Sequence, residues 1–144
     1  MQIRKAAIGD EGQLFSLLNQ FPSEGGGHQW ENGVDTFRSV IQNPELGSVF
    51  VADEKGTILG LITLSFPTAI RCAGIYASIE EFIVDQEGRG KGIGGMLIKT
   101  AMEEARSRGC HELQVNRPSE SGYPVYIRYG WKDLGRHLNL VFSK

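Results

Sequence analysis

A glycine-rich segment at residues 87–97 separates an apolar stretch with strand character from one with helix character. Its sequence, EGRGKGIGGML, places five glycines and two cations in eleven positions. Residues 76–84, just before it, form a mostly apolar run that is typical of an extended strand. After it, apolar side chains recur on one face of a helix that Gly109 would end: Leu97, Ile98, Ala101, Met102 and Ala105. The chain must therefore fold a strand, a loop of bare backbone and a helix in direct succession.

This arrangement favours binding of an anion by the main chain. The first N–H groups of a helix have no intrahelical partner, and the helix dipole adds partial positive charge there. Glycines remove the Cβ atoms that would hold a phosphate away from the backbone and permit positive φ. Arg89 and Lys91 add charge. We therefore predict a phosphate-binding loop; a plain turn with two solvated cations is the structural alternative.

Two other phosphate motifs fit the segment less well. Gly90, Gly92 and Gly95 satisfy the dinucleotide fingerprint GxGxxG, but further βα units should follow it, and the chain is too short for them. A P-loop needs Ser or Thr after Gly-Lys, where this sequence has Gly92. Nucleotide binding through GxGxxG stays open as a weaker alternative.

The hydrophobic pattern along the chain predicts one mixed α/β domain at residues 1–144. Asp10 with Gln13 is typical of a capped helix start. Pro44 must end the second helix. The expected strands cover residues 2–6, 48–53, 57–66, 76–84, 111–115 and 137–142. Four helices are expected: one that begins after Asp10, one from residue 34 to before Pro44, one from the glycines to Arg108, and one at residues 123–130.

Composition limits the classes of partner. The formal net charge of −2 gives no electrostatic reason to expect nucleic acid or an anionic membrane surface. The apolar runs are far shorter than the ~20 residues of a membrane span, and no basic-then-apolar leader begins the sequence, so we expect a cytoplasmic protein. Cys72 and Cys110 are isolated in the sequence and indicate neither a disulfide nor a metal site.

Residues 84–94, VDQEGRGKGIG, closely resemble the acetyl-CoA-binding motif of the GNAT family of N-acetyltransferases. That motif, R/Q-x-x-G-x-G/A, is matched by Arg89, Gly92 and Gly94. YPVYIRYGW, at residues 123–131, looks like the family's C-terminal fYeklGF signature, and IEEFIV, at 79–84, is similar to a strand of the glucosamine-phosphate acetyltransferases. The resemblance covers most of the chain. It implies an α/β GNAT fold: a mixed, mostly antiparallel central sheet, splayed between its fourth and fifth strands, with helices on both faces.

The same resemblance implies acetyl-CoA as the cofactor. Pantetheine would pair with backbone in the splay, and the diphosphate would sit on the amides of the glycine segment. An amine would then attack the acetyl carbonyl directly through a tetrahedral intermediate. The implied cofactor-binding residues are Phe82, Ile83, Val84, Arg89, Gly90, Lys91, Gly92, Ile93, Gly94, Gly95 and Asn116.

Three residues are candidates for catalysis. Tyr126 falls on the family's tyrosine, and a phenol with a pKa near 10 stays protonated at neutral pH and can donate to a thiolate. Its structural alternative is a core aromatic. Glu80 and Glu81 are candidate bases; strand alternation predicts that they point to opposite faces, so at most one faces the acceptor, with Glu81 ranked first. A solvated strand face or an ion pair is the alternative for both.

The acceptor is predicted from less specific signals. Glu24, His28 and Trp30, between the first two helices, would suit a cationic amine, and His137 lies in a segment that borders the acceptor site in this family. A small-molecule amine or amino sugar is favoured over a protein N-terminus or lysine. A non-catalytic acyl-CoA-binding or sensing module on the same fold is the alternative of a different class. Family members are often dimers, which leaves a homodimer open.

Overall fold

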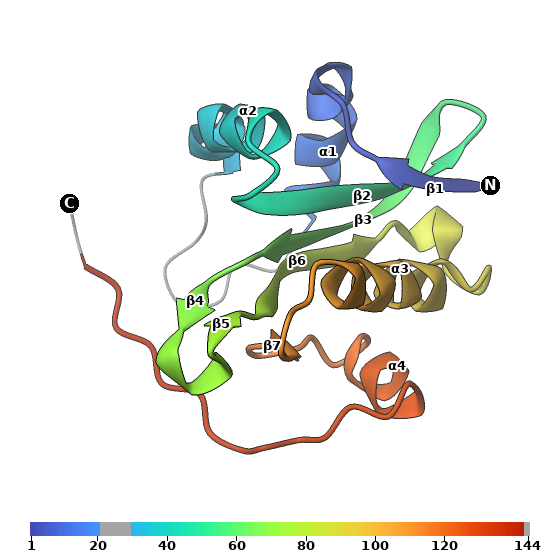
Figure 1. Cartoon of the computed structure of the whole chain (residues 1–144). Helices are drawn as coiled ribbons and strands as arrows, with labels where there is room; N and C mark the ends of the chain where they lie inside the picture. Colours follow the sequence, from blue (N-terminus) through green and yellow to red (C-terminus); the bar gives the residue numbers. More distant parts are fainter. Residues whose placement is uncertain (21–29, 143–144) are drawn as a thin grey trace.

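A five-stranded sheet with the order β1-β2-β3-β6-β7 forms the centre of the molecule (Figure 1). The computed structural model describes residues 1–20 and 30–142 of the chain. The strands are β1 (Gln2–Lys5), β2 (Gly47–Glu54), β3 (Thr57–Ser65), β6 (Ala77–Val84) and β7 (Leu113–Val115). The first four pair antiparallel, whereas β6 and β7 are parallel. The predicted mixed, mostly antiparallel sheet is confirmed.

Helices cover both faces of this sheet, as predicted (Figure 1). The helices α1 (Glu11–Leu18) and α2 (Val34–Gln42) pack on one face, and α3 (Ile93–Ser107) packs on the other. The short helix α4 (Tyr123–Arg128) follows β7. Gly109, with φ of +74°, lies just past the end of α3 as expected. Two short segments, η1 (Ile8–Asp10) and η2 (Trp30–Gly33), precede α1 and α2.

The sheet has a core on each side because its central strands are apolar on both faces. Phe50, Ile62 and Leu64 pack with α3, whereas Val51 and Leu61 pack with α1. Leu97 and Ile98 of α3 are fully buried, and burial of each such side chain stabilises the fold by about 1.5–3 kcal/mol.

A small hairpin between β3 and β6 was not predicted. It consists of β4 (Thr68–Ala69) and β5 (Gly74–Ile75), joined by η3 (Ile70–Cys72). Two paired residues a strand are too few to give a readable alternation in the sequence.

Asp10 is the N-cap residue of α1, as predicted, but among the described residues neither its side chain nor that of Gln13 makes a capping hydrogen bond. The carboxylate of Asp10 reaches back to the Ala7 amide at 2.7 Å and pairs with the Arg4 guanidinium at 2.8 Å. Gln13 instead accepts a hydrogen bond from the Ile58 amide at 2.8 Å and donates to the Gly56 carbonyl at 3.0 Å. The Asp10 side chain thus connects the start of α1 to β1, and the Gln13 side chain connects α1 to the turn between β2 and β3.

The predicted last strand, at residues 137–142, is also wrong. These residues lie in an extended C-terminal tail, and no strand in the described part of the chain pairs with them. Figure 1 shows the tail passing beneath β7 and leaving the body of the domain. The alternating pattern is real, but strand assignment requires a neighbour, which the sequence pattern does not supply.

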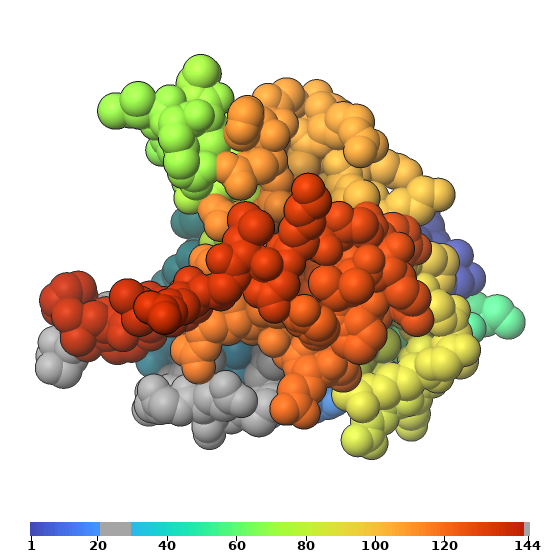
Figure 2. Space-filling model, turned by 90° about the horizontal axis from the view of Figure 1, so that it is seen from below, coloured from blue at the N-terminus to red at the C-terminus, as the bar shows by residue number. Residues whose placement is uncertain are grey.

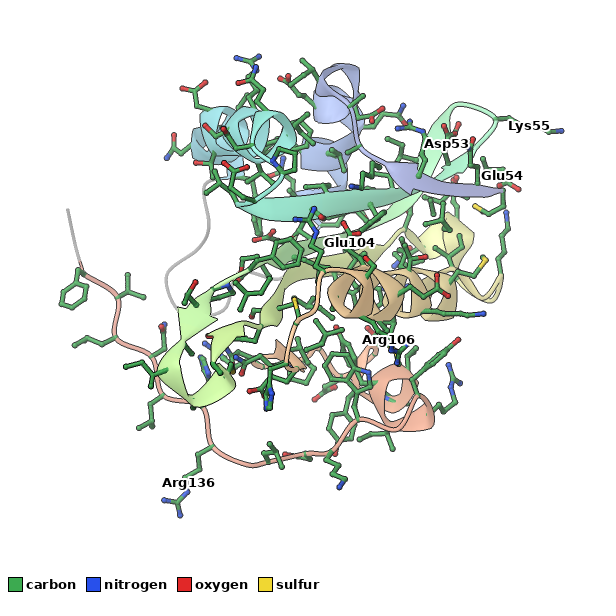
Figure 3. The ribbon with its side chains drawn as sticks, in the orientation of Figure 1. Asp53, Glu54, Lys55, Glu104, Arg106 and Arg136 are labelled. Carbon is green, nitrogen blue, oxygen red and sulfur yellow. The ribbon has the colours of Figure 1, made fainter. Side chains whose placement is uncertain are left out.

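A polar cluster ties α3 to β2 at the end of the sheet away from the glycines. Glu104 points from α3 toward the sheet (Figure 3) and accepts a hydrogen bond from the Ser48 hydroxyl at 2.6 Å. Burial opposes ionisation of Glu104, but Ser48, Lys5 and Arg108 outweigh it and lower the pKa of the carboxyl. The cluster therefore holds a charged carboxylate against the sheet.

Candidate functional site

The strands β6 and β7 pair at one end and separate at the other. Ala77, Ser78 and Ile79 pair with β7, and no pairing follows within the described residues. From Glu81 to Val84, β6 continues to pair with β3 on its other side. The predicted splay is thus present, and it leaves β6 backbone along the gap without a strand partner. Extended backbone of this kind can pair with the amides of a ligand.

A β-bulge lies where the splay begins. Thr63 of β3 faces Glu81, and the next residue, Leu64, faces Ile79, so Glu80 is the extra residue in β6. A bulge of this kind bends the strand and redirects a side chain. It explains why β6 turns away from β7 at this point.

The bulge also overturns the expectation that Glu80 and Glu81 point to opposite faces. Glu81 accepts a hydrogen bond from the Thr63 hydroxyl, and Glu80 accepts one from the Ser65 hydroxyl at 2.7 Å. Thr63 and Ser65 are two residues apart on β3, so they share a face. Both carboxylates therefore lie on the face opposite α3, with Glu81 half-buried and Glu80 exposed. Strand alternation could not reveal this, because one inserted residue reverses it.

The glycine segment presents a row of backbone N–H groups at the start of α3. The Arg89 amide donates to Gln86 within η4 (Gln86–Gly88) at 3.1 Å, and the next bonded amide, that of Met96, donates to Gly92 at 3.1 Å. The intervening amides, those of residues 90–95, have no backbone partner among the described residues. The free row therefore begins one residue later than the motif does.

Gly90 and Gly92 give this row its shape. Their φ values are +82° and +76°, and a Cβ added to either residue would meet nothing within 4 Å. Glycine is therefore required by the backbone conformation, and the space beside it is open. Lys91 pairs with Glu54 at 3.2 Å, through two exposed side chains, and this surface pair does not cover the amides.

Gly94 and Gly95 lie against other parts of the fold, and at Gly95 the absence of a Cβ allows the close approach of a neighbour. A Cβ on Gly94 would lie 3.4 Å from the Phe82 ring, and one on Gly95 would lie 3.0 Å from the Tyr129 hydroxyl. The contact with Phe82 places the start of α3 against the splayed half of β6. Tyr129 was not predicted as a site residue; its place in YPVYIRYG, three residues after Tyr126, is the available signal.

Tyr126 lies between β6 and the end of α4. Its ring centroid is 5.8 Å from that of Phe82 and 4.8 Å from that of Trp131, and its side chain is buried. Burial raises the pKa of its phenol above the usual range, so the hydroxyl is protonated at neutral pH. Within the described residues the hydroxyl makes no hydrogen bond. It can therefore donate to a ligand.

The remaining predicted residues do not gather at the splay. Asn116 and His137 line a groove that also takes in β7, and both are exposed. Trp30 packs against the cluster formed by α1, β2 and β3. Glu24 and His28 lie outside the described residues. Among residues 1–20 and 30–142, no His, Cys, Asp and Glu side chains group as metal ligands would, and no helix is long and apolar enough to cross a membrane.

Comparison with known proteins gives two informative relatives. Glucosamine 6-phosphate N-acetyltransferase 1 of Oryza sativa is 31% identical over 74 residues, 51% of this chain and 44% of the relative. Aminoalkylphosphonate N-acetyltransferase of Salmonella typhimurium is 32% identical over 100 residues, 68% of this chain and 64% of the relative. The matches thus span about half to two thirds of these curated relatives.

A predicted acetyltransferase from Clostridium acetobutylicum, whose crystal structure was solved with acetyl-CoA, shares the fold. Its TM-score is 0.81 at 24% identity, with 97% of this chain and 95% of that chain covered. The model of the acetyltransferase (GNAT) family matches residues 13–131, which include every described element from α1 to α4 except the first two residues of α1. On this match, together with the splayed sheet and the glycine segment, the chain belongs to the acetyltransferase (GNAT) family.

Proposed function

We propose that this chain is an acetyl-CoA-dependent N-acetyltransferase that moves an acetyl group to the primary amine of a small molecule. One observation carries the proposal: the amides of residues 90–95, which have no backbone partner in the described part of the chain, lie at the start of α3 directly beside the splayed half of β6. The first feature suits a diphosphate and the second suits an extended arm that bears amides. A ligand that needs both, in this order, is coenzyme A.

The residues present fit this ligand. The open space beside Gly90 and Gly92 would admit phosphate oxygens to hydrogen-bond distance of the backbone. Arg89 and Lys91 are exposed next to it and supply positive charge. The Asp85 amide donates to Leu59, so Ile83, two residues earlier, turns its polar groups toward Leu61 of β3. Phe82 and Val84, on either side of Ile83, turn theirs toward the gap and would pair with the pantetheine arm. Acetyl-CoA supplies the acetyl thioester; the chain supplies its orientation.

Two proton transfers remain for the side chains. Glu81, with Glu80 beside it, would accept the proton of the amine, directly or through a water molecule. Thr63 holds the Glu81 carboxylate in place. Tyr126 would protonate the departing thiolate, because its hydroxyl is protonated and donates to no described residue. The amine attacks the acetyl carbonyl directly, so no acyl-enzyme is required.

The names of the relatives narrow the acceptor. Glucosamine 6-phosphate and an aminoalkylphosphonate both carry a primary amine and an anionic phosphorus group. We therefore place phosphorylated amino sugars and aminophosphonates first among the acceptors. A protein N-terminus or a lysine side chain is a separate acceptor class that the same assay tests.

The test combines coenzyme binding with thiol release. Calorimetry with coenzyme A measures binding, and thiol release from acetyl-CoA is followed with glucosamine 6-phosphate, an aminoalkylphosphonate, glucosamine and a lysine-containing peptide. We expect binding, and turnover with at least one phosphorus-bearing amine that exceeds turnover with glucosamine. No coenzyme binding would refute the proposal. Binding without turnover across all amines would support the non-catalytic sensing module instead.

A further inference from the structure

We propose that Thr63 is a positioning residue for the general base, and that its hydroxyl selects Glu81 over Glu80 for this task. The inference deepens the proposed function and rests on it. Two hydroxyls of β3 meet two carboxylates of β6: Thr63 meets Glu81, and Ser65 meets Glu80. Among the described residues, the first of these hydroxyls also bonds to the backbone of the carboxylate's own residue, and the second does not.

The Thr63 hydroxyl makes two hydrogen bonds to the same residue. It accepts one from the Glu81 amide at 2.9 Å and donates its proton to the Glu81 carboxylate. A hydroxyl has one proton, so each of the two bonds has a defined direction. The main chain and the side chain of Glu81 are thus tied to one oxygen atom, and the carboxylate cannot rotate away without breaking the bond to it.

Threonine holds that oxygen more firmly than serine would. Its β-branched side chain is restricted at χ1, so the hydroxyl keeps its direction. Thr63 is half-buried, and its neighbours in β3, Ile62 and Leu64, are buried in the core beneath α3. The packing of β3 therefore fixes the backbone from which the hydroxyl projects.

The β-bulge explains why the two bonds form at this place. In an unbroken ladder Glu80 would face Leu64, and its side chain would enter the core beneath α3. Burial of an unpaired carboxylate there would be costly. The extra residue keeps Glu80 on the opposite face, and the Thr63 hydroxyl accepts the Glu81 amide where the bulge disrupts the ladder.

Glu80 is held at one point among the described residues. The Ser65 hydroxyl donates to its carboxylate at 2.7 Å, through an exposed contact. Serine lacks the methyl group that restricts χ1 in threonine. Ser65 is the last residue of β3, and Figure 2 shows the following hairpin of β4 and β5 projecting from the body of the molecule. The Glu80 carboxylate is therefore less fixed than that of Glu81.

This difference matters because a base must be both oriented and charged. The amine loses a proton as its nitrogen bonds to the acetyl carbon, and the carboxylate takes that proton directly or through water. A hydroxyl that donates to a carboxylate favours its charged, proton-accepting form. Thr63 therefore acts through Glu81: it fixes the direction of the carboxylate and transfers no proton itself.

A double-mutant cycle tests whether Thr63 acts through Glu81. Thiol release from acetyl-CoA is measured for the unaltered chain, Thr63→Val, Glu81→Gln and the double variant, with the amine that the unaltered chain turns over fastest. We expect Thr63→Val to lower kcat about tenfold without changing KM for acetyl-CoA. In the Glu81→Gln chain it should have no further effect. Losses of the same size in both chains would refute the positioning role.

Thr63→Ser separates the hydroxyl from the packing of the side chain. It should recover most of the kcat lost in Thr63→Val, because it keeps the hydroxyl and removes a methyl group. Ser65→Ala is the matched control, since it removes the hydroxyl of the other pair and should have the smaller effect. A larger loss in Ser65→Ala than in Thr63→Val would assign the base to Glu80 and overturn the proposal.

Hydrogen exchange tests the contact without turnover. The Glu81 amide should exchange about tenfold faster in Thr63→Val than in the unaltered chain, and Thr63→Ala should give the same result if valine disturbs the packing. The Leu97 amide, inside α3, is the internal reference for an intact fold. Equal exchange at Glu81 would overturn the role of Thr63 and leave the proposed function in place. A chain that turns over no amine would overturn both.

Discussion

The ring of Tyr126 packs edge-on against the ring of Phe82, with centroids 5.8 Å apart. Phe82 belongs to the splayed half of β6 and also lies against Gly94 of α3. This contact therefore joins α4, β6 and α3 where the coenzyme arm would end. Among the described residues no side-chain polar atom is both buried and without a hydrogen-bond partner. The Tyr126 hydroxyl has no partner there, so its oxygen is open to the site and contributes little to stability.

We therefore predict that Tyr126→Phe lowers turnover and leaves stability nearly unchanged. Loss of the proton donor should lower kcat about 10²-fold, while the melting temperature and the Kd for coenzyme A stay nearly unchanged. Tyr123→Phe on the same helix is the control, since its hydroxyl bonds to Asp133 and not at the splay. Steady-state kinetics and a thermal melt check both. An unchanged kcat would leave Tyr126 as a core aromatic.

A second prediction distinguishes the roles of the two carboxylates on β6, those of Glu80 and Glu81. Glu81 is half-buried and held by Thr63, so Glu81→Gln should lower kcat about 10²-fold and remove the acidic limb of the pH–rate profile. Glu80→Gln should have the smaller effect, because Glu80 is exposed. Glu103→Gln, on the exposed side of α3, is the control. If Glu80→Gln lowered kcat more than Glu81→Gln, the general base would be Glu80, the bulged residue.

The strand, loop and helix around the glycines could be predicted because each has a local cause. Helical spacing after Leu97, positive φ at glycine and the stop at Gly109 all act within a few residues. The bulge at Glu80 could not be predicted, because it depends on how β6 pairs with β3. Whether residues 137–142 form a strand depends in the same way on a neighbouring strand, which no local pattern specifies.

For the candidate site, the segments that take part could be predicted from the sequence. The hydrogen bonds of individual amides and the directions of individual side chains could not. The motif indicated amides from Arg89 onward, but the turn at Gln86 takes up the Arg89 amide. Likewise, adjacent glutamates suggested opposite faces until one inserted residue put them together. Tertiary contacts, such as that of Tyr129 with Gly95, have no local signature at all.

A third prediction separates the ligand role of Gly92 from its backbone role. Gly92→Ala and Gly109→Ala place the same methyl at φ of +76° and +74°, at opposite ends of α3, and neither methyl meets another atom. Both should therefore destabilise the fold by a similar amount, about 1–2 kcal/mol. Gly92→Ala should also weaken coenzyme A binding at least tenfold, as measured by calorimetry. Equal Kd values for the two variants would contradict a phosphate cradle at this position.

The last prediction concerns pH and the ion pair of Asp10 with Arg4. The hydrogen bond from Arg4 lowers the pKa of the Asp10 carboxyl below its ordinary value of 3.8. A carboxyl with a lower pKa in the folded state stabilises the protein above the unfolded pKa, and this contribution is lost as pH falls through about 4 and below.

Asp10→Asn should therefore lower the free energy of unfolding by about 1–2 kcal/mol at pH 7, and the difference from the unaltered chain should shrink toward pH 3. Urea unfolding at a series of pH values measures it. Asp35→Asn is the control, because the Asp35 side chain is 97% exposed and its pair with Arg38 is 3.6 Å long; that variant should change little at any pH. A difference that is independent of pH would show that Asp10 acts through packing and not through its charge.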